Sequence, residues 1–276
     1  MNRRKFIQLS LTASAGLIGA GSLAGPVASN APSRPKRGLG LGIRSDGPWR
    51  KKLQQSGAQW FYTWGPKAPQ SVPDGIEFVP MIWGRTGVEM MAAIPGILKQ
   101  QGSRELLGFN EPDRAEQSSL TVDQALELWP GLMQLGLPLG APGCASVDGD
   151  WIKSFMKGVK ERQLRVDFMT VHSYGDLDVD HLMNHLAKVH DTFQLPLWLT
   201  EFAVGDWNAK TRADNRYQPD QIVQFIQEAL PRLDRCDFIS RYAWFPAQPD
   251  DRALGPCALF NADGSLTPVG QAYNTV

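Results

Sequence analysis

The chain has 276 residues, of which 42% are hydrophobic and 20% charged, and 28 basic side chains balance 28 acidic ones. This composition is typical of a globular protein, and a net charge of zero gives no general attraction to nucleic acid or to an anionic membrane. We therefore expect a neutral partner and no nucleic-acid binding. The three cysteines are too few for a disulfide scaffold, and their spacing does not indicate a zinc site.

The first residues have the pattern of an export signal. Arginines at positions 3 and 4 precede Phe6, and an uncharged segment rich in Leu, Ala and Gly runs from Leu9 to about Ala28. The paired arginines favour the twin-arginine route. The alternative is an uncut membrane anchor, but several glycines and Pro26 make this segment a weak span. We predict that residues 1–31 are removed on export, which leaves residues 32–276 as a periplasmic or secreted protein without stable membrane association.

The remaining residues, about 245 in number, alternate short strand-like runs with segments of helical periodicity. The predicted strands are residues 38–43, 59–64, 77–83, 105–109, 137–141, 166–172, 197–202 and 238–245. The predicted helices are residues 49–56, 88–101, 122–135, 151–162, 179–193 and 219–232. The link after the second strand is short and rich in proline, so its helix is expected to be missing.

Alternation of this kind predicts a parallel sheet with crossover helices. Eight repeats in this length favour a single-domain α/β fold, the (β/α)8 or TIM barrel. A doubly wound open sheet is the alternative, but no Gly-x-Gly-x-x-Gly follows the first strand, and the sequence has no P-loop, nucleophile elbow or His-Glu-x-x-His motif. The sequence thus gives no indication of a nucleotide cofactor or a catalytic metal, and we expect no cofactor.

Two glutamates follow apolar runs that should be buried strands. Glu111 comes directly after the fourth run, which Pro112 ends, and Glu201 lies near the end of the seventh. In a barrel these strands lie across from each other, and their carboxyl ends share the face where active sites form. A pair of carboxyl groups across one cleft is the requirement for glycoside hydrolysis. We predict that Glu111 and Glu201 are the catalytic pair.

Several polar and aromatic residues at the predicted strand ends are candidates for substrate contact, because the flat faces of sugar rings pack on aromatic side chains. His172 and Tyr174 end the sixth strand, and Asn110 precedes Glu111. The alternatives are a structural histidine inside the barrel rim and a turn-forming asparagine. Four tryptophans lie at or just after strand ends and are predicted to line the cleft: Trp64, Trp83, Trp207 and Trp244. Trp60, Trp198 and the tryptophans of the helices are assigned to the core.

The Asn110-Glu111-Pro112 motif and the second glutamate on strand seven resemble the retaining glycoside hydrolases of clan A. More narrowly, the chain is similar to glycoside hydrolase family 128, β-1,3-glucanases related to the Asl1-like cell-wall proteins. The matching segments are residues 62–66, 78–84, 108–113, 167–174, 198–203 and 241–245. One departure is Thr63, where many relatives have asparagine. The resemblance implies that residues 32–276 are a catalytic (β/α)8 domain, with Glu111 as general acid/base, Glu201 as nucleophile and Asn110 on the sugar 2-hydroxyl.

The expected function is that of an exported, monomeric endo-β-1,3-glucanase that uses two glutamates in a double displacement. Two alternatives stay open at this point. One is a glycan-binding barrel with little or no turnover, since a fold does not guarantee a function. The other is a clan A hydrolase of a different β-linked polysaccharide, because the motifs fix the chemistry better than the linkage.

Overall fold

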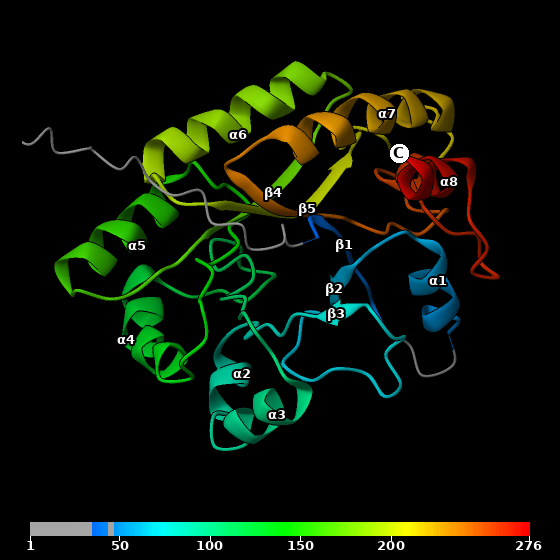
Figure 1. The fold of residues 1–276 in the computed structure, drawn as a ribbon. Coiled ribbons are helices and arrows are strands. Elements are labelled where there is room, and N and C mark those ends of the chain that lie inside the picture. Colours follow the sequence, from blue (N-terminus) through cyan, green and yellow to red (C-terminus); the bar gives the residue numbers. More distant parts are fainter. Residues whose placement is uncertain (1–34, 44–46) are drawn as a thin grey trace, which may run out of the picture. The chain divides into compact units, whose positions relative to one another are not determined.

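The computed structural model describes residues 35–43 and 47–276, and the predicted export leader lies outside these residues (Figure 1). Six strands form one parallel sheet in the order β3-β2-β1-β6-β5-β4. They are β1 (Arg37–Gly40), β2 (Trp60–Tyr62), β3 (Glu77–Phe78), β4 (Met169–Gly175), β5 (Leu197–Val204) and β6 (Ile239–Trp244).

Two shorter segments, residues 105–110 and 139–144, join the two edges of this sheet. Parallel backbone bridges connect them to each other and to the edge strands: Met81 to Leu107, Leu106 to Leu139, and Gly140 to Phe168. The hydrogen bonds follow the same pattern, because Leu107 N donates to Pro80 O at 2.9 Å and Ala141 N donates to Phe168 O at 2.8 Å. The (β/α)8 prediction is therefore confirmed, with its fourth and fifth strands reduced to single bridges.

Helices surround the strands in Figure 1. They are α1 (Trp49–Gln55), α2 (Arg85–Glu89), α3 (Ile94–Gln101), α4 (Val122–Met133), α5 (Asp150–Glu161), α6 (Val179–Phe193), α7 (Pro219–Arg235) and α8 (Pro268–Thr275), with a short 3-10 turn at Gly255–Cys257. The prediction of one helix over residues 88–101 was wrong. A proline in the first turn of α3 starts a new helix there, because proline lacks the N–H that a continuing helix needs. Between β2 and β3 the described chain has no helix, as expected.

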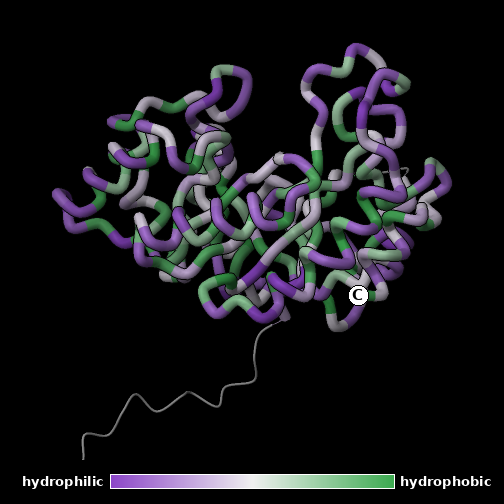
Figure 2. The backbone as a smooth tube through the Cα atoms, turned by 90° about the horizontal axis from the view of Figure 1, so that it is seen from above, coloured by the Kyte–Doolittle hydropathy of each residue, from purple (hydrophilic) through white to green (hydrophobic). Residues whose placement is uncertain are grey.

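The hydrophobic core has two parts. The larger lies between the strands and the helices, and the smaller fills the barrel interior with Trp60, Tyr62, Leu107, Phe168 and Trp198 among its members. In Figure 2 hydrophobic and hydrophilic stretches alternate along the backbone, and hydrophilic residues are common where the chain turns on the outside. Trp60 and Trp198 are thus core residues, as predicted. In the described residues no helix is long and apolar enough to cross a membrane.

A buried charge cluster lies in the half of the barrel where the strands begin. Arg241 donates to Glu77 at 2.7 Å, and its guanidinium carbon lies 5.3 Å and 4.5 Å from the ring centroids of Trp60 and Trp198. A second carboxylate, that of Glu105, lies 3.7 Å from the same nitrogen of Arg241. The cationic side chain is therefore held between acidic and aromatic partners at this end of the barrel.

Candidate active site

The two predicted catalytic glutamates reach the same space from different strands. Glu201 is on β5, and Glu111 follows the segment of residues 105–110. Between Val171 and His172 the pairing of β4 with β5 shifts by one residue, so that His172 lies opposite Glu201. A bulge of this kind redirects a side chain at the end of a strand. As a result the imidazole and the carboxylate lie side by side within the barrel mouth.

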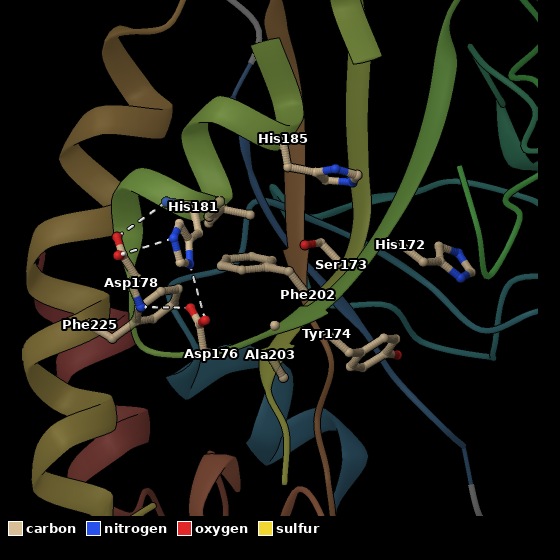
Figure 3. A pocket seen from close by; sticks show the side chains of 12 residues that line it. His172, Ser173, Tyr174, Asp176, Asp178, His181, His185, Phe202, Ala203 and Phe225 are labelled. Carbon is tan, nitrogen blue, oxygen red and sulfur yellow. Dashed lines mark hydrogen bonds and ion pairs between the residues drawn. The ribbon is translucent and has the colours of Figure 1, made fainter. Parts of the chain in front are cut away.

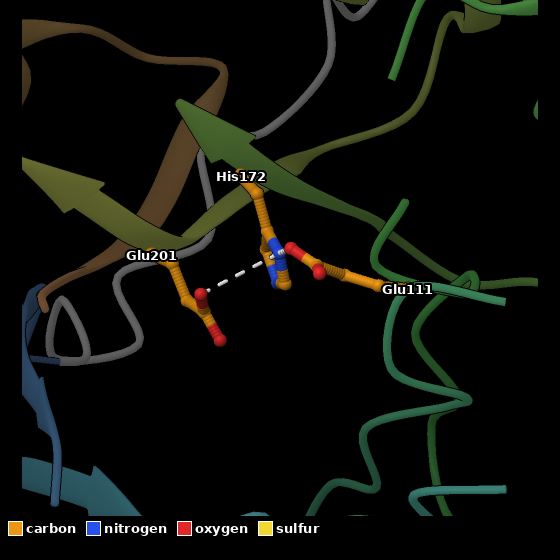
Figure 4. A group of neighbouring side chains, drawn as sticks. All are labelled: Glu111, His172 and Glu201. Atoms are coloured by element: carbon orange, nitrogen blue, oxygen red, sulfur yellow. Dashed lines mark hydrogen bonds and ion pairs between the residues drawn. The ribbon is translucent and has the colours of Figure 1, made fainter. Parts of the chain in front are cut away.

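Glu111, His172 and Glu201 point toward one another (Figure 4). The Nδ1 atom of His172 is 2.9 Å from Oε1 of Glu111 and 3.6 Å from Oε2 of Glu201. One nitrogen or oxygen atom from each of the three side chains lies within 4.8 Å of those of the other two. The side chains of Glu111 and Glu201 are only 16% and 6% exposed. Carboxyl groups about 5 Å apart are typical of retaining glycosidases, whereas inverting ones keep them about 6.5 Å or more apart.

Three aromatic residues donate hydrogen bonds to the carboxylate of Glu201. Tyr62 donates to Oε1 at 3.0 Å, Trp64 Nε1 donates to the same atom at 2.8 Å, and the hydroxyl of Tyr174 donates to Oε2. Burial and the negative charge of Glu201 raise the pKa of both tyrosines well above the usual value, so the phenols keep the protons that they donate. The negative charge of Glu201 is therefore stabilised by fixed donors, and its carboxylate plane is held in one orientation.

His172 lies between the two carboxylates with its side chain 1% exposed. Burial by itself lowers the pKa of the imidazole, but the charge of Glu201 and the hydrogen bond to Glu111 outweigh it, and the net result is a raised pKa. The spacing of the three residues would also suit a metal ion. N–H and O–H donors already occupy both oxygens of Glu201, and this favours a hydrogen-bonded site over a metal centre.

The backbone of two site residues adopts the left-handed conformation. Glu111 has φ 40° and Trp64 has φ 56°, values that L-residues with large side chains rarely adopt. The turn at Glu111 is held from both sides, because its N–H donates to Gly143 O at 2.7 Å and the Asp113 carboxylate accepts the N–H of Ala145 and of Ser146. Surrounding contacts thus impose the conformation that presents the Glu111 side chain to His172.

A cavity of about 450 Å³ lies over the two glutamates. It brings together seven of the predicted site residues, namely Trp64, Trp83, Asn110, Glu111, Tyr174, Glu201 and Trp207. Trp207 is 55% exposed, and its ring packs against that of Tyr174 in a T-shaped arrangement. Gln117, Phe245 and Leu254 also line the cavity and were not predicted. Gln117 lies in a polar loop without a strand pattern, so no sequence signal marks it, but its side-chain oxygen accepts a hydrogen bond from Asn110 at 3.4 Å.

The prediction that Trp244 contacts sugar was wrong. Trp244 is fully buried, its indole nitrogen donates to Cys257 O at 3.0 Å, and its ring packs against Phe202 and Tyr273. It therefore belongs to the layer between the barrel and the helices. The neighbouring residue Phe245 reaches the cleft instead, because successive residues of a strand point to opposite faces.

A separate cavity of about 300 Å³ lies on the other side of β4, toward α6 and α7. In Figure 3 the ring of His181 lies between Asp176 and Asp178 at one end of this cavity: its Nδ1 is hydrogen-bonded to Asp176 at 3.1 Å, and its Nε2 is 3.6 Å from the carboxylate of Asp178. The rings of His172 and Tyr174 point away from that cluster. The two glutamates do not line this cavity. It is thus distinct from the cleft over the catalytic pair.

Comparison with known proteins identifies the family. A family model described as the glycosyl hydrolase catalytic core matches residues 38–273. Alkali-sensitive linkage protein 1 of Schizosaccharomyces pombe is 27% identical over 248 residues, which are 86% of this chain but 44% of the yeast protein. The chain thus spans less than half the length of that relative.

Solved structures agree with this assignment. A family 128, subgroup I endo-β-1,3-glucanase from Amycolatopsis mediterranei, in complex with laminaritriose, is 34% identical with a TM-score of 0.75, and the match covers 87% of this chain and 98% of that one. A subgroup VII oligosaccharide-binding protein from Trichoderma gamsii is 25% identical with a TM-score of 0.67, covering 88% and 93% of the two chains. The chain therefore belongs to the glycosyl hydrolase catalytic core family and, within it, to glycoside hydrolase family 128.

Proposed function

We propose that the protein hydrolyses β-1,3-linked glucan by endo attack and retains the anomeric configuration. The observation that carries this proposal is the pair of largely buried carboxylates, Glu111 and Glu201, with oxygen atoms less than 5 Å apart at the mouth of the barrel. The hydrogen bonds around each carboxylate differ, and this difference supports separate roles for the two residues.

Glu201 is the nucleophile in this proposal. Its carboxylate oxygen attacks the anomeric carbon as the glycosidic C–O bond breaks, and Glu111 gives its proton to the leaving oxygen. In the second step a water molecule attacks the anomeric carbon and gives a proton to Glu111, and the bond to Glu201 breaks. The donors on Glu201 stabilise the charge that it regains, and His172, hydrogen-bonded to Glu111, orients the acid/base.

The lining of the cleft supports a neutral polysaccharide as substrate. Trp64, Trp83 and Trp207 offer aromatic surface, and Asn110 has a buried side-chain oxygen that forms no hydrogen bond within the described residues. In our proposal Asn110 binds the sugar 2-hydroxyl, a contact that strengthens as charge develops on the ring. The Amycolatopsis relative, an endo-β-1,3-glucanase with bound laminaritriose, supports the assignment of the linkage.

A glycan-binding protein without turnover is the second candidate. It is favoured by the similarity to the Trichoderma oligosaccharide-binding protein, which has the same fold. Against it stand the two carboxylates, because a protein that only binds sugar does not need a nucleophile with three hydrogen-bond donors. We therefore place hydrolysis first.

The test is the release of reducing sugar from laminarin, curdlan, carboxymethyl cellulose and mannan by the purified protein. We expect activity on the two β-1,3-glucans alone. Glu201→Gln should lower kcat roughly 10⁴-fold or more, since it removes the nucleophile and keeps the shape of the side chain. Glu161→Gln, at the exposed end of α5, is the matched control and should keep full activity.

The outcomes separate the candidates. The first product should have the β configuration by proton NMR, as retention requires. Binding to a β-1,3-glucan with no turnover by the wild-type protein would establish the glycan-binding candidate instead. Turnover confined to carboxymethyl cellulose or mannan would reject the linkage that we propose.

A further inference from the structure

One wall of the catalytic cleft is formed where two loops meet, residues 205–218 after β5 and residues 245–254 after β6. Trp207 comes from the first loop and Leu254 from the second. Both side chains lie against Gly205, because a Cβ atom there would be 3.1 Å from Cδ2 of Leu254 and 3.2 Å from Cε2 of Trp207. The indole is more than half exposed, so burial alone does not fix it. Its position depends on how the backbones of the two loops are held.

The side chain of Asn215 joins the first loop to the second. Asn215 is buried, and its Nδ2 atom donates to Arg252 O at 2.9 Å and to Ala253 O at 2.8 Å. Its Oδ1 atom accepts the N–H of Tyr217 at 3.0 Å. The two N–H donors and the oxygen of the amide are therefore all used. Buried groups of this kind are costly to leave unpaired, so the amide holds the two loops together.

A second connection runs in the opposite direction, from the second loop to the first. The guanidinium of Arg252 donates through Nη1 to Ala209 O at 2.7 Å and to Trp207 O at 3.3 Å. The N–H of Asp206 donates to Ala253 O at 3.1 Å. The carbonyl of Trp207 and the residue before it are thus both tied to the second loop. A surface loop of this length would be mobile without such contacts.

We propose that Asn215 is a positioning residue for hydrolysis, which keeps the ring of Trp207 in place for the substrate by holding the two loops together. The inference rests on the proposed function, because it takes the occupant of the cleft to be glucan. Asn215 does not line the cleft, so it acts through Trp207. A ring that is fixed before binding loses less freedom when a sugar packs on it, and the affinity is higher. The effect therefore falls on KM, while bond cleavage by the two glutamates is unaffected.

The experiment measures kcat and KM on laminari-oligosaccharides for Asn215→Asp and a matched control. Asn215→Asp keeps the shape of the side chain but replaces its N–H donors by an oxygen that faces two carbonyl oxygens. The control, Asn208→Asp, makes the same change in the same loop at an exposed residue that does not line the cleft. Asn215→Asp should raise KM about tenfold and change kcat less than about twofold. Asn208→Asp should leave both unchanged.

A Trp207→Ala background separates positioning from a general structural role. In that background Asn215→Asp should leave KM unchanged, because the ring through which it acts is gone. An increase in KM of equal size with and without Trp207 would overturn the proposal. So would a loss that falls on kcat alone.

Arg252→Met tests the same connection from the second loop at an exposed residue, and it decides the question if Asn215→Asp does not fold. It should raise KM about threefold, and Arg252→Lys, which keeps a donor, should restore part of the loss. Trypsin cleavage after Lys210, which is exposed in the first loop, reports directly on the release of that loop. It should be faster in Asn215→Asp and in Arg252→Met than in Asn208→Asp.

The outcomes for the positioning role and for the proposed function are distinct. Hydrolysis by the wild-type protein with the same KM in Asn215→Asp and Asn208→Asp would overturn the positioning role and leave the proposed function intact. Binding of β-1,3-oligosaccharides without turnover would overturn hydrolysis, and the dissociation constants of the same variants would then replace KM. Failure of the wild-type protein to bind or cleave any β-1,3-oligosaccharide would overturn both.

Discussion

The imidazole of His172 separates two acidic groups that would otherwise repel each other. Its closeness to Glu201 and its hydrogen bond to Glu111 raise its pKa despite its burial, so the imidazole holds its proton more tightly in the folded protein. A charge of this kind stabilises the folded protein only over part of the pH range, because it depends on a proton that the unfolded chain holds less tightly.

The pH dependence of stability should reveal this proton. Since the pKa of His172 in the folded protein lies above the ordinary value of 6.5, its stabilising effect is fully present below that value and is lost as the pH rises through the folded pKa. We expect the free energy of unfolding of the wild-type protein to exceed that of His172→Gln by more at about pH 5.5 than at about pH 9. Urea unfolding of both proteins at both pH values measures these two differences in free energy. A difference between the wild-type protein and His172→Gln that grows with pH would contradict a protonated His172.

At the level of the elements, the fourth and fifth strands depend on a close backbone approach. A Cβ atom on Gly108 would lie 2.7 Å from the carbonyl oxygen of Gly140 and 2.9 Å from the ring of Trp129. Neither neighbour is the flexible end of a side chain, so the segments would have to move apart. The absence of a side chain at Gly108 thus allows the barrel to close at this seam.

Alanine substitutions at two glycines should have opposite effects. Gly108→Ala should lower the free energy of unfolding by about 1–3 kcal/mol, the usual cost of overpacking a core. Gly131→Ala, in the helix α4, should raise it by about 0.5–1 kcal/mol, because the added Cβ meets only Met91 at 3.6 Å and glycine disfavours a helix. Chemical denaturation of both variants and the wild-type protein measures these free energies of unfolding. A Gly108→Ala protein as stable as the wild type would show that the two segments can move apart at no cost.

The sequence predicts the elements better than it predicts which face of a strand points inward. The alternation of eight apolar runs with amphipathic helices was enough to predict the barrel, and two glutamates at strand ends were enough to find the pair that the structure brings together. On β6 and the residue after it, however, Tyr242 and Trp244 alternate with Arg241, Ala243 and Phe245, and both sets are buried or half-buried. When both faces of a strand are covered, hydrophobicity does not distinguish them.

The remaining parts of the site come from loops and from contacts distant in sequence. Gln117 reaches the cleft from a polar connection, and the hydrogen bond from Trp64 to Glu201 spans 137 positions. Neither follows from local periodicity. The bulge that turns His172 toward Glu201 is likewise a property of the pairing between two strands and has no signature in either one.

At the scale of the whole molecule, the two ends of the barrel are built differently. The carboxyl ends of the strands carry the cleft, while the opposite half holds Arg241 against Glu77 and two tryptophan rings. In barrels of this fold the carboxyl ends of the strands generally carry the catalytic residues, and residues at the opposite end generally serve stability. Loss of one partner of this buried pair, at the end opposite the cleft, would therefore destabilise the folded protein, since removing one member leaves an uncompensated charge.

The location of the protein in the cell is also a property of the whole chain. We propose that residues 1–31 direct export by the twin-arginine route and are then removed. Replacing Arg3 and Arg4 together by lysine keeps the charge and should leave the uncleaved precursor inside the cell. N-terminal sequencing of the exported wild-type protein should find a first residue near Pro32. Unchanged export of the double variant would reject the twin-arginine route, and an intact leader on the exported protein would reject cleavage.

The left-handed backbone at Trp64 and Glu111 sets a limit on how this protein can be stabilised. Conformations of this kind cost of order 1–3 kcal/mol each, and glycine or asparagine would adopt them more easily. The chain keeps an indole and a carboxylate at these positions, both of which face the catalytic cleft. Substitutions that relieve the backbone there would remove the groups that the cleft uses. Engineering for heat resistance should therefore leave these two turns unchanged and act on helix positions such as Gly131.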